Sequence, residues 1–267
     1  MSDTAAATVA AGVAALEAAG CDTPRLDAEL LVAEAIGIDR AGLLADPRRE
    51  LGADVARIAS EHLERRARRE PVAYILGRRA FRRLELRVDR RVLVPRPETE
   101  LVVELALELA PHGACAHDVG TGSGAIALAL KDERADLVVS GSDSSQGALA
   151  VARLNRERLG LDVELTAHGG LPAGPYDLVL ANLPYIGTDE WPGLAPELRE
   201  FEPPEAFLAG HDGLAAIPAL VHEAPAGTLL VLEHGATHGP AVRALLSEPE
   251  THRDLAGHER VTVGRAP

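Results

Sequence analysis

Residues 117–185 constrain the fold of this chain more than any other stretch. They open with His-Asp-Val-Gly-Thr-Gly-Ser-Gly, directly after a short apolar run, and close with Asn-Leu-Pro-Tyr after another such run. Between these two motifs, Asp143 ends a third apolar run. Because the carboxyl ends of parallel strands meet at one edge of a sheet, we expect the glycine turn, Asp143 and the Asn-Leu-Pro-Tyr corner to line one pocket.

Strand-like and helix-like runs alternate from Pro111 to the end of the chain. This alternation predicts an α/β fold with a mostly parallel, doubly wound sheet and helices on both faces. We expect an antiparallel pair of short strands at 253–258 and 260–264. The other expected strands lie at 114–119, 137–142, 163–167, 178–181 and 228–233, and the helices lie near 124–131, 146–159, 213–224 and 240–247.

The first part of the chain has a different pattern. Apolar residues recur there at helical spacing, with breaks at Gly20, Gly37 and Pro71, and predict a small helical domain at 1–76. Its last long helix is expected to turn four arginines to water: Arg65, Arg66, Arg68 and Arg69. Alternating apolar residues then predict a β-hairpin linker at 77–97, with its turn near Asp89 and Arg90, followed by the α/β domain at 98–267.

The charge pattern limits the possible partners. A net charge of −14 argues against stable nucleic-acid binding, which depends on clustered Lys and Arg. Residues 48–96 are an exception, with fifteen arginines against seven acidic residues. Two interpretations of this segment stay open, namely a solvated helix face and a surface that faces an anion.

Other classes of site and location receive little support. No apolar run approaches the roughly 18–20 residues of a membrane span, and no signal pattern opens the chain, so we expect a cytoplasmic protein with no membrane association. Cys21 and Cys115 match no metal-ligand spacing. His234 and His238 lie four residues apart, but two glycines oppose a continuous helix there, so no metal site is expected.

The glycine turn has the spacing Gly-x-Gly-x-Gly, not the Gly-x-Gly-x-x-Gly of dinucleotide sites. Glycines let a backbone turn sharply and approach a ligand. Asp118 can hold an ammonium group, and Asp143 can accept both hydroxyls of a ribose; the alternative for Asp143 is a helix N-cap. The set predicts a site for S-adenosylmethionine formed by Asp118, Gly120, Thr121, Gly122, Ser123, Gly124, Asp143 and Asn182.

The Asn-Leu-Pro-Tyr corner fits a planar nitrogen nucleophile. An amide or exocyclic amine is a poor nucleophile with two N–H groups, so it must be aligned and its hydrogens held. The Asn182 side-chain oxygen and the Leu183 carbonyl can each accept one N–H. Pro184 stiffens the corner and the Tyr185 ring can stack on the flat group. We therefore expect Asn182, Leu183, Pro184 and Tyr185 to be the catalytic and substrate-binding residues, with positioning supplying roughly 7–11 kcal/mol. The alternative is a proline turn in which Asn182 is only a local cap.

The chain resembles the peptide chain release factor N5-glutamine methyltransferase family over nearly its whole length. The motifs that carry the resemblance are Arg-Glu-Pro-Val-Ala-Tyr-Ile-Leu-Gly at 69–77, Val-Pro-Arg-Pro-Glu-Thr-Glu at 94–100, Asp-Val-Gly-Thr-Gly-Ser-Gly at 118–124, and Glu-Pro at 202–203 with Gly-His-Asp-Gly at 210–213. The resemblance implies a seven-stranded, Rossmann-like class I methyltransferase domain joined by a β-hairpin to a helical substrate-docking domain.

The resemblance also implies an activity. The expected reaction transfers a methyl group from S-adenosylmethionine to the glutamine N5 in the Gly-Gly-Gln loop of bacterial peptide chain release factors, leaving S-adenosylhomocysteine. The protein is expected to act as a monomer. Two alternatives stay open: an N6-adenine nucleic-acid methyltransferase, and a release-factor-docking protein with reduced activity.

Three positions depart from the family pattern. Leu183 replaces the first proline of the usual Asn-Pro-Pro-Tyr corner, which is tolerable if position 183 supplies only its carbonyl. Residues 167–170, Ala-His-Gly-Gly, lack the acid that the family tends to place near the adenine. His238 stands where a glutamine is expected after 233–235.

Overall fold

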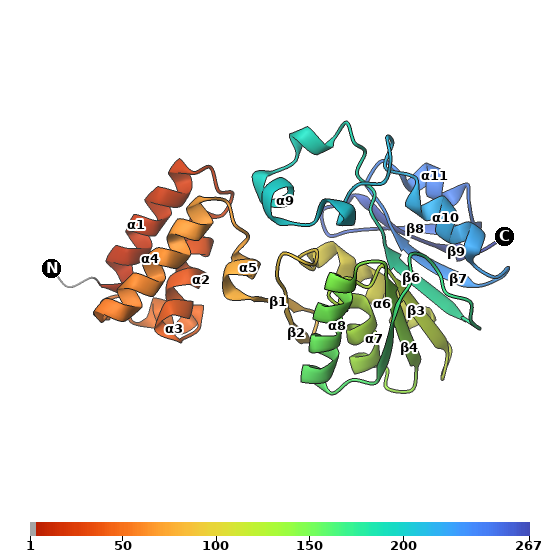
Figure 1. Ribbon diagram of the computed structural model, residues 1–267, viewed down its shortest axis with the longest axis horizontal. Coiled ribbons are helices and arrows are strands. Elements are labelled where there is room, and N and C mark those ends of the chain that lie inside the picture. Colours follow the sequence, from red (N-terminus) through yellow and green to blue (C-terminus); the bar gives the residue numbers. More distant parts are fainter. Residues whose placement is uncertain (1–3) are drawn as a thin grey trace. The chain divides into compact units, whose positions relative to one another are not determined.

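The structure, a computed structural model, describes residues 4–267. The chain divides into two compact units, Met1–Gly77 and Arg78–Pro267 (Figure 1). Each unit has its own buried apolar cluster. Of residues 77–97, which were expected to link two domains, Gly77 ends the first unit and 78–97 belong to the second. No helix within 4–267 has the length and apolar character that a membrane span requires.

The first unit is helical, as expected. A methyl group at Gly12 would lie 2.7 Å from the Leu63 side chain, so glycine lets α1 and α4 approach closely. Leu16, Leu31 and Leu63 belong to the shared core. The helices are α1 (Ala5–Ala18), α2 (Pro24–Ile36), α3 (Arg40–Ala45), α4 (Ala53–Ala67) and α5 (Val72–Leu76).

One arginine of α4 does not face water. Arg66 is buried, and its Nε donates to Asp27 Oδ2 of α2 at 2.7 Å, so its predicted exposure was wrong. The Thr23 hydroxyl donates to the other Asp27 oxygen at 2.8 Å. Arg65 is more exposed and pairs with Glu70 at 2.7 Å. Several arginines of the 48–96 segment are thus engaged in ion pairs within their own unit.

The second unit begins with a hairpin of β1 (Arg78–Phe81) and β2 (Leu84–Arg87). The turn lies at Arg82 and Arg83, so its predicted position near Asp89 and Arg90 was wrong. The alternation of buried residues explains the position of the turn. Buried positions shift from odd to even numbers between Phe81 and Leu84, and such a shift indicates a two-residue turn. Arg82, with a left-handed φ of 49°, donates from Nε to Glu133 at 2.5 Å.

Within the described chain the main sheet has seven strands in the order β5-β4-β3-β6-β7-β9-β8. The first five are parallel, and β9 pairs antiparallel with both β7 and β8. The α/β prediction is confirmed. The strands are β3 (Cys115–Val119), β4 (Val138–Asp143), β5 (Val163–Ala167), β6 (Leu178–Asn182), β7 (Leu229–Glu233), β8 (Ser247–Arg253) and β9 (Glu259–Arg265).

Helices cover both faces of this sheet (Figure 1). On β6, Leu178 and Leu180 pack with α6, α7 and α8, whereas Val179 and Ala181 pack with α10 and α11. This alternation buries the strand on both faces, as parallel sheets require. The helices are α6 (Glu100–Leu109), α7 (Ala125–Glu133), α8 (Gln146–Leu159), α10 (Ala216–Glu223) and α11 (Gly239–Arg243).

Two regions differ from the sequence-based expectation. The chain between β6 and α10 forms α9 (Pro196–Phe201) and two 3-10 turns, η2 (Trp191–Gly193) and η3 (Pro204–Ala206). The terminal antiparallel pair is present, but its first strand precedes 253–258, where an Asp254-centred turn stands instead. Asp254 accepts three backbone or side-chain hydrogen bonds there, and this turn chemistry was not recognised in the sequence.

Candidate active site

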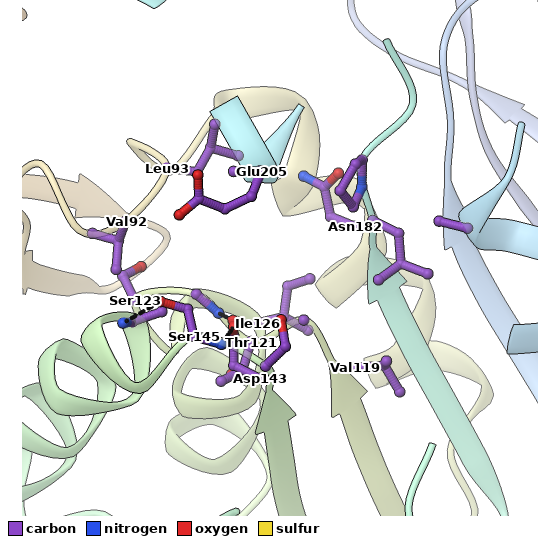
Figure 2. A pocket seen from close by; sticks show the side chains of 18 of the residues that line it. Val92, Leu93, Val119, Thr121, Ser123, Ile126, Asp143, Ser145, Asn182 and Glu205 are labelled. Carbon is purple, nitrogen blue, oxygen red and sulfur yellow. Dashed lines mark hydrogen bonds between the residues drawn. The ribbon is translucent and has the colours of Figure 1, made fainter. Parts of the chain in front are cut away.

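A cavity of about 310 Å³ lies at the carboxyl ends of β3, β4 and β6. Figure 2 shows Asn182 and Glu205 on one side of this cavity and Asp143 and Ser145 on the other. The strand order reverses at β3, which has β4 on one side and β6 on the other. Open α/β folds bind ligands at the carboxyl ends of the strands at such a point. The glycine turn, Asp143 and the start of the Asn-Leu-Pro-Tyr corner therefore share one pocket.

The glycine turn forms the floor of the cavity. Gly120, Thr121, Gly122 and Ser123 line it, whereas Gly124 lies behind them at the start of α7. Gly124 has a φ of 84°, and a methyl group there would lie 2.7 Å from a Leu128 methyl. Glycine is needed here both for the left-handed backbone and for the packing of α7.

Asp118 lies beneath the turn and does not line the cavity. Its Oδ2 accepts from the Thr121 hydroxyl at 2.7 Å and from Ala127 N at 3.2 Å, which braces the turn against α7. Its Oδ1 is buried and has no hydrogen-bond partner in the described chain. Burial raises the pKa of this carboxyl to about 7. The prediction that Asp118 holds an ammonium group stays a prediction, with Oδ1 as the free acceptor.

Asp143 is at the cavity, at the end of β4. Its Oδ2 accepts from Gly122 N at 2.9 Å and its Oδ1 from Ser145 N at 2.8 Å. The N-cap of α8 is Ser145, whose hydroxyl accepts from Ala148 N. Asp143 is therefore not that cap. It ties the glycine turn to the next loop and keeps lone pairs for a ligand.

The corner brings Asn182, Leu183 and Pro184 to the opposite side of the cavity. Asn182 Nδ2 donates to the Thr99 hydroxyl at 3.0 Å, and its Oδ1 has no partner among the described residues. A methyl group at Gly120 would lie 3.0 Å from a Leu183 methyl, so the glycine turn and the corner are in close contact.

Tyr185 does not line the cavity. Its hydroxyl donates to Glu233 Oε1 at 3.5 Å, and burial together with the Glu233 charge raises the pKa of the phenol to about 12. Glu233 is 1% exposed at the end of β7, and burial raises its pKa to about 7. The predicted stacking of the Tyr185 ring on substrate stays a prediction.

The segment after the hairpin forms a wall that sequence reasoning only partly anticipated. Its residues 91–96 line the cavity with the exception of Val94. Glu202, 4% exposed, fixes this wall by accepting from Val94 N at 2.9 Å and from Arg96 Nη2 at 2.5 Å. The Pro-Arg-Pro and Glu-Pro motifs, 106 residues apart, thus meet through one carboxylate.

A further carboxylate lies where the third strand of the unit ends. His168, Gly169 and Gly170 line the cavity there, together with Glu223 of α10. Glu223 Oε2 accepts from Leu171 N at 2.8 Å, and a methyl group at Gly170 would lie 2.5 Å from that oxygen. Glycine at 170 therefore leaves room for Glu223. No sequence motif pointed to Glu223, since the residue lies more than fifty positions beyond the loop that it contacts.

The titratable side chains of residues 4–267 form no group of three or more that could hold a metal ion. The polar groups of the cavity are instead carboxylates, hydroxyls, amides, backbone N–H groups, the guanidinium groups of Arg91 and Arg96, and the His168 ring. Such a set can hold a neutral or cationic nucleoside and orient a planar amide.

Comparison with known proteins identifies both parts of the chain. The family model described as the PrmC N-terminal domain matches residues 8–77, and the methyltransferase small domain matches residues 99–191. Among solved structures, a methyltransferase from Pyrococcus furiosus resembles 75% of this chain and 96% of its own with a TM-score of 0.50 at 17% identity. That likeness confirms the predicted methyltransferase-type fold.

Two curated relatives cover almost the whole chain. The release factor glutamine methyltransferase of Caulobacter vibrioides is 42% identical over 265 residues, which span 93% of this chain and 92% of the relative. That of Xylella fastidiosa is 41% identical over 270 residues, spanning 96% and 98%. With this identity over both units, the chain belongs to the release factor glutamine methyltransferase family.

Proposed function

We propose that this protein transfers a methyl group from S-adenosylmethionine to the side-chain nitrogen N5 of the glutamine in a release factor's Gly-Gly-Gln loop. The observation that carries the proposal is the position of Asn182. Its amide lies in the same cavity as the glycine turn and Asp143, with Nδ2 engaged by Thr99 and Oδ1 left to accept from a substrate. The relatives are named release factor glutamine methyltransferases, which supports a release-factor glutamine as the acceptor.

The chain's own groups fit the proposed cofactor. Asp143 keeps one lone pair on each oxygen for the two ribose hydroxyls. The glycine turn gives the ligand close access to backbone N–H groups. The free Oδ1 of Asp118 provides an acceptor for an ammonium group, reached by a small shift of the turn above it.

The adenine end of the pocket is proposed to use Glu223. The loop 167–170 lacks an acid, but the Glu223 carboxylate lines the same end of the cavity from α10. Its Oε2 is held by Leu171 N, so the remaining lone pairs can accept an N–H from the exocyclic amine. Ala219 and Leu220, one turn earlier on α10, offer an apolar surface for the ring.

The corner is proposed to perform the chemistry by positioning. When bound, the sulfonium supplies an electrophilic methyl group that carries its own leaving group. Asn182 Oδ1 and the Leu183 carbonyl each accept one N–H of the glutamine amide, which fixes its nitrogen for in-line attack. An N–C bond forms as the C–S bond breaks, and the nitrogen then releases one proton to solvent. Any residue at 183 supplies the carbonyl, so leucine is compatible with this role.

The helical first unit is proposed to dock the release factor, and the protein is proposed to act as a monomer in the cytoplasm, where release factors work.

Several arginines of the 48–96 segment are paired with acidic groups of their own unit, which argues against a dedicated nucleic-acid surface. The N6-adenine alternative is not favoured by the relatives, which are named for glutamine methylation.

The test is transfer of labelled methyl groups from S-adenosylmethionine to a purified bacterial release factor. We expect one methyl group per release factor, located by mass spectrometry on the Gly-Gly-Gln peptide. A release factor with Ala in place of that glutamine is the control and should take up no label. Label on the control protein, or on RNA or DNA offered in its place, would overturn the proposal.

A further inference from the structure

Three polar side chains lie close together at the Asn-Leu-Pro-Tyr corner. They are Thr99, at the end of η1 (Pro97–Thr99), Tyr185, and Glu233 at the end of β7. Thr99 is 4% exposed and Glu233 is 1% exposed. Buried polar groups need hydrogen-bond partners, so the contacts of these side chains indicate what each one does.

The sheet places Glu233 beside the catalytic corner. Asn182 and Glu233 are paired neighbours in the register of β6 and β7, and each is the last residue of its strand. Asn182 Nδ2 donates to the Thr99 hydroxyl at 3.0 Å, and the Tyr185 hydroxyl donates to Glu233 Oε1 at 3.5 Å. Glu233 therefore contacts the residue at the end of the corner and lies next to the residue at its start.

Thr99 contacts Asn182 and also interacts with Glu233. Interaction with the Thr99 hydroxyl lowers the pKa of the Glu233 carboxyl, in opposition to burial. Glu233 Oε2 is buried and has no hydrogen-bond partner in the described chain, so it is an acceptor still open to a donor. A carboxylate can only accept. The Thr99 hydrogen is consequently drawn toward Glu233, and the Thr99 oxygen is left to accept from Asn182.

We propose that Glu233, acting through Thr99, fixes the orientation of the Asn182 carboxamide so that its oxygen faces the substrate nitrogen. The inference rests on the proposed function and concerns the same site. A carboxamide has a donor end and an acceptor end of nearly equal size, and its orientation is set only by its partners. With Nδ2 tied to Thr99, Oδ1 is presented to an N–H donor, which selects an amide over a carboxylate.

The charge of Glu233 is part of this device. Protonated Glu233 can donate to Thr99, which then donates to Asn182 and favours the reversed carboxamide. The groups that face Glu233 are Tyr185, Thr99, Glu98 and Arg260: Arg260 lowers its pKa and Glu98 raises it. With burial, the balance brings the pKa to about 7, so the ordered arrangement predominates above that pH.

The first test compares Thr99→Val, which keeps the shape but loses the hydroxyl, with Thr99→Ser, which keeps the hydroxyl. The assay is release-factor methylation by the full chain, with inhibition by a release factor carrying Glu in place of the loop glutamine. For Thr99→Val we expect kcat to fall about tenfold or more, which corresponds to the loss of one oriented hydrogen bond. The preference of the enzyme for the Gln release factor over the Glu release factor should also decrease. Thr99→Ser should restore both.

The second test is the pH profile of kcat. Wild-type activity should fall as the pH drops through about 7, and the profile of Glu233→Gln should lose this limb because Gln cannot ionise. An unchanged Gln-over-Glu preference in Thr99→Val, or an intact acidic limb in Glu233→Gln, would overturn the inference. Failure of the proposed function is distinguishable, since wild-type protein would then methylate no release factor at any pH.

Discussion

The role of Asp143 gives a prediction whose magnitude follows from its contacts. In Asp143→Asn one oxygen is replaced by an NH₂ group, so one of the two acceptors for the ribose hydroxyls is lost. A hydrogen bond to a charged group contributes about 1.5–3 kcal/mol and a neutral one about 0.5–1.5 kcal/mol, so the net loss is about 1–2 kcal/mol. The dissociation constant of S-adenosylhomocysteine should therefore rise about 5- to 30-fold.

The assay is isothermal titration calorimetry with S-adenosylhomocysteine and with an analogue that lacks the 2′ and 3′ hydroxyls. Wild-type protein should lose affinity for the analogue, and Asp143→Asn should lose much less, because the contact is already weakened. Asp39→Asn is a matched control, since Asp39 caps α3 in the first unit by accepting from Gly42 N. Its affinity should equal that of the wild type.

Two results would refute the reasoning about Asp143. One is an unchanged dissociation constant in Asp143→Asn. The other is an equal loss of affinity for both ligands, which would mean that the substitution only loosens the glycine turn held through Gly122 N. In either case Asp143 would be a brace for the turn and not a ligand of the ribose.

Two further predictions concern the turn and the adenine end of the pocket. Gly124→Ala should destabilise the protein by about 1–3 kcal/mol more than Gly160→Ala, because both positions are left-handed but only Gly124 faces a packed neighbour, Leu128 at 2.7 Å; equal melting temperatures for the two variants would contradict this. Glu223→Ala should weaken S-adenosylhomocysteine binding about threefold to tenfold but leave binding of the analogue without the 6-amino group unchanged. A parallel loss for both ligands would remove Glu223 from the adenine site.

Sequence reasoning predicted the fold well where the pattern is local. Buried parallel strands read as apolar runs, so the positions of β3 to β7 follow from sequence to within about two residues. The hairpin turn was misplaced because Asp89 and Arg90 form an attractive turn pair, while the shift in alternation at Arg82 is a weaker signal. Arg66 was misplaced because its ion-pair partner, Asp27, lies on a different helix.

The candidate site was predictable in its motifs and not in its supports. The glycine turn, Asp143 and the Asn-Leu-Pro-Tyr corner each follow a strand, so topology alone brings them together. Glu202 and Glu223 accept hydrogen bonds from segments more than fifty residues away, and no local sequence pattern predicts such contacts. Thr99 occupies the N-cap position of α6, but its hydroxyl makes no cap hydrogen bond and accepts from Asn182 across the fold.

The pairing of Asn182 with Glu233 means that the proposed function depends on the register between β6 and β7. Side chains alternate between the faces of a strand, so a slip of one residue would carry Glu233 to the opposite face. An enzyme with one residue deleted from β7 could still bury an apolar strand and close its sheet, yet lose the partner of its corner. Transplanting Asn-Leu-Pro-Tyr alone onto another parallel sheet would meet the same obstacle. What must be moved is the motif together with the neighbouring strand, held at its original offset.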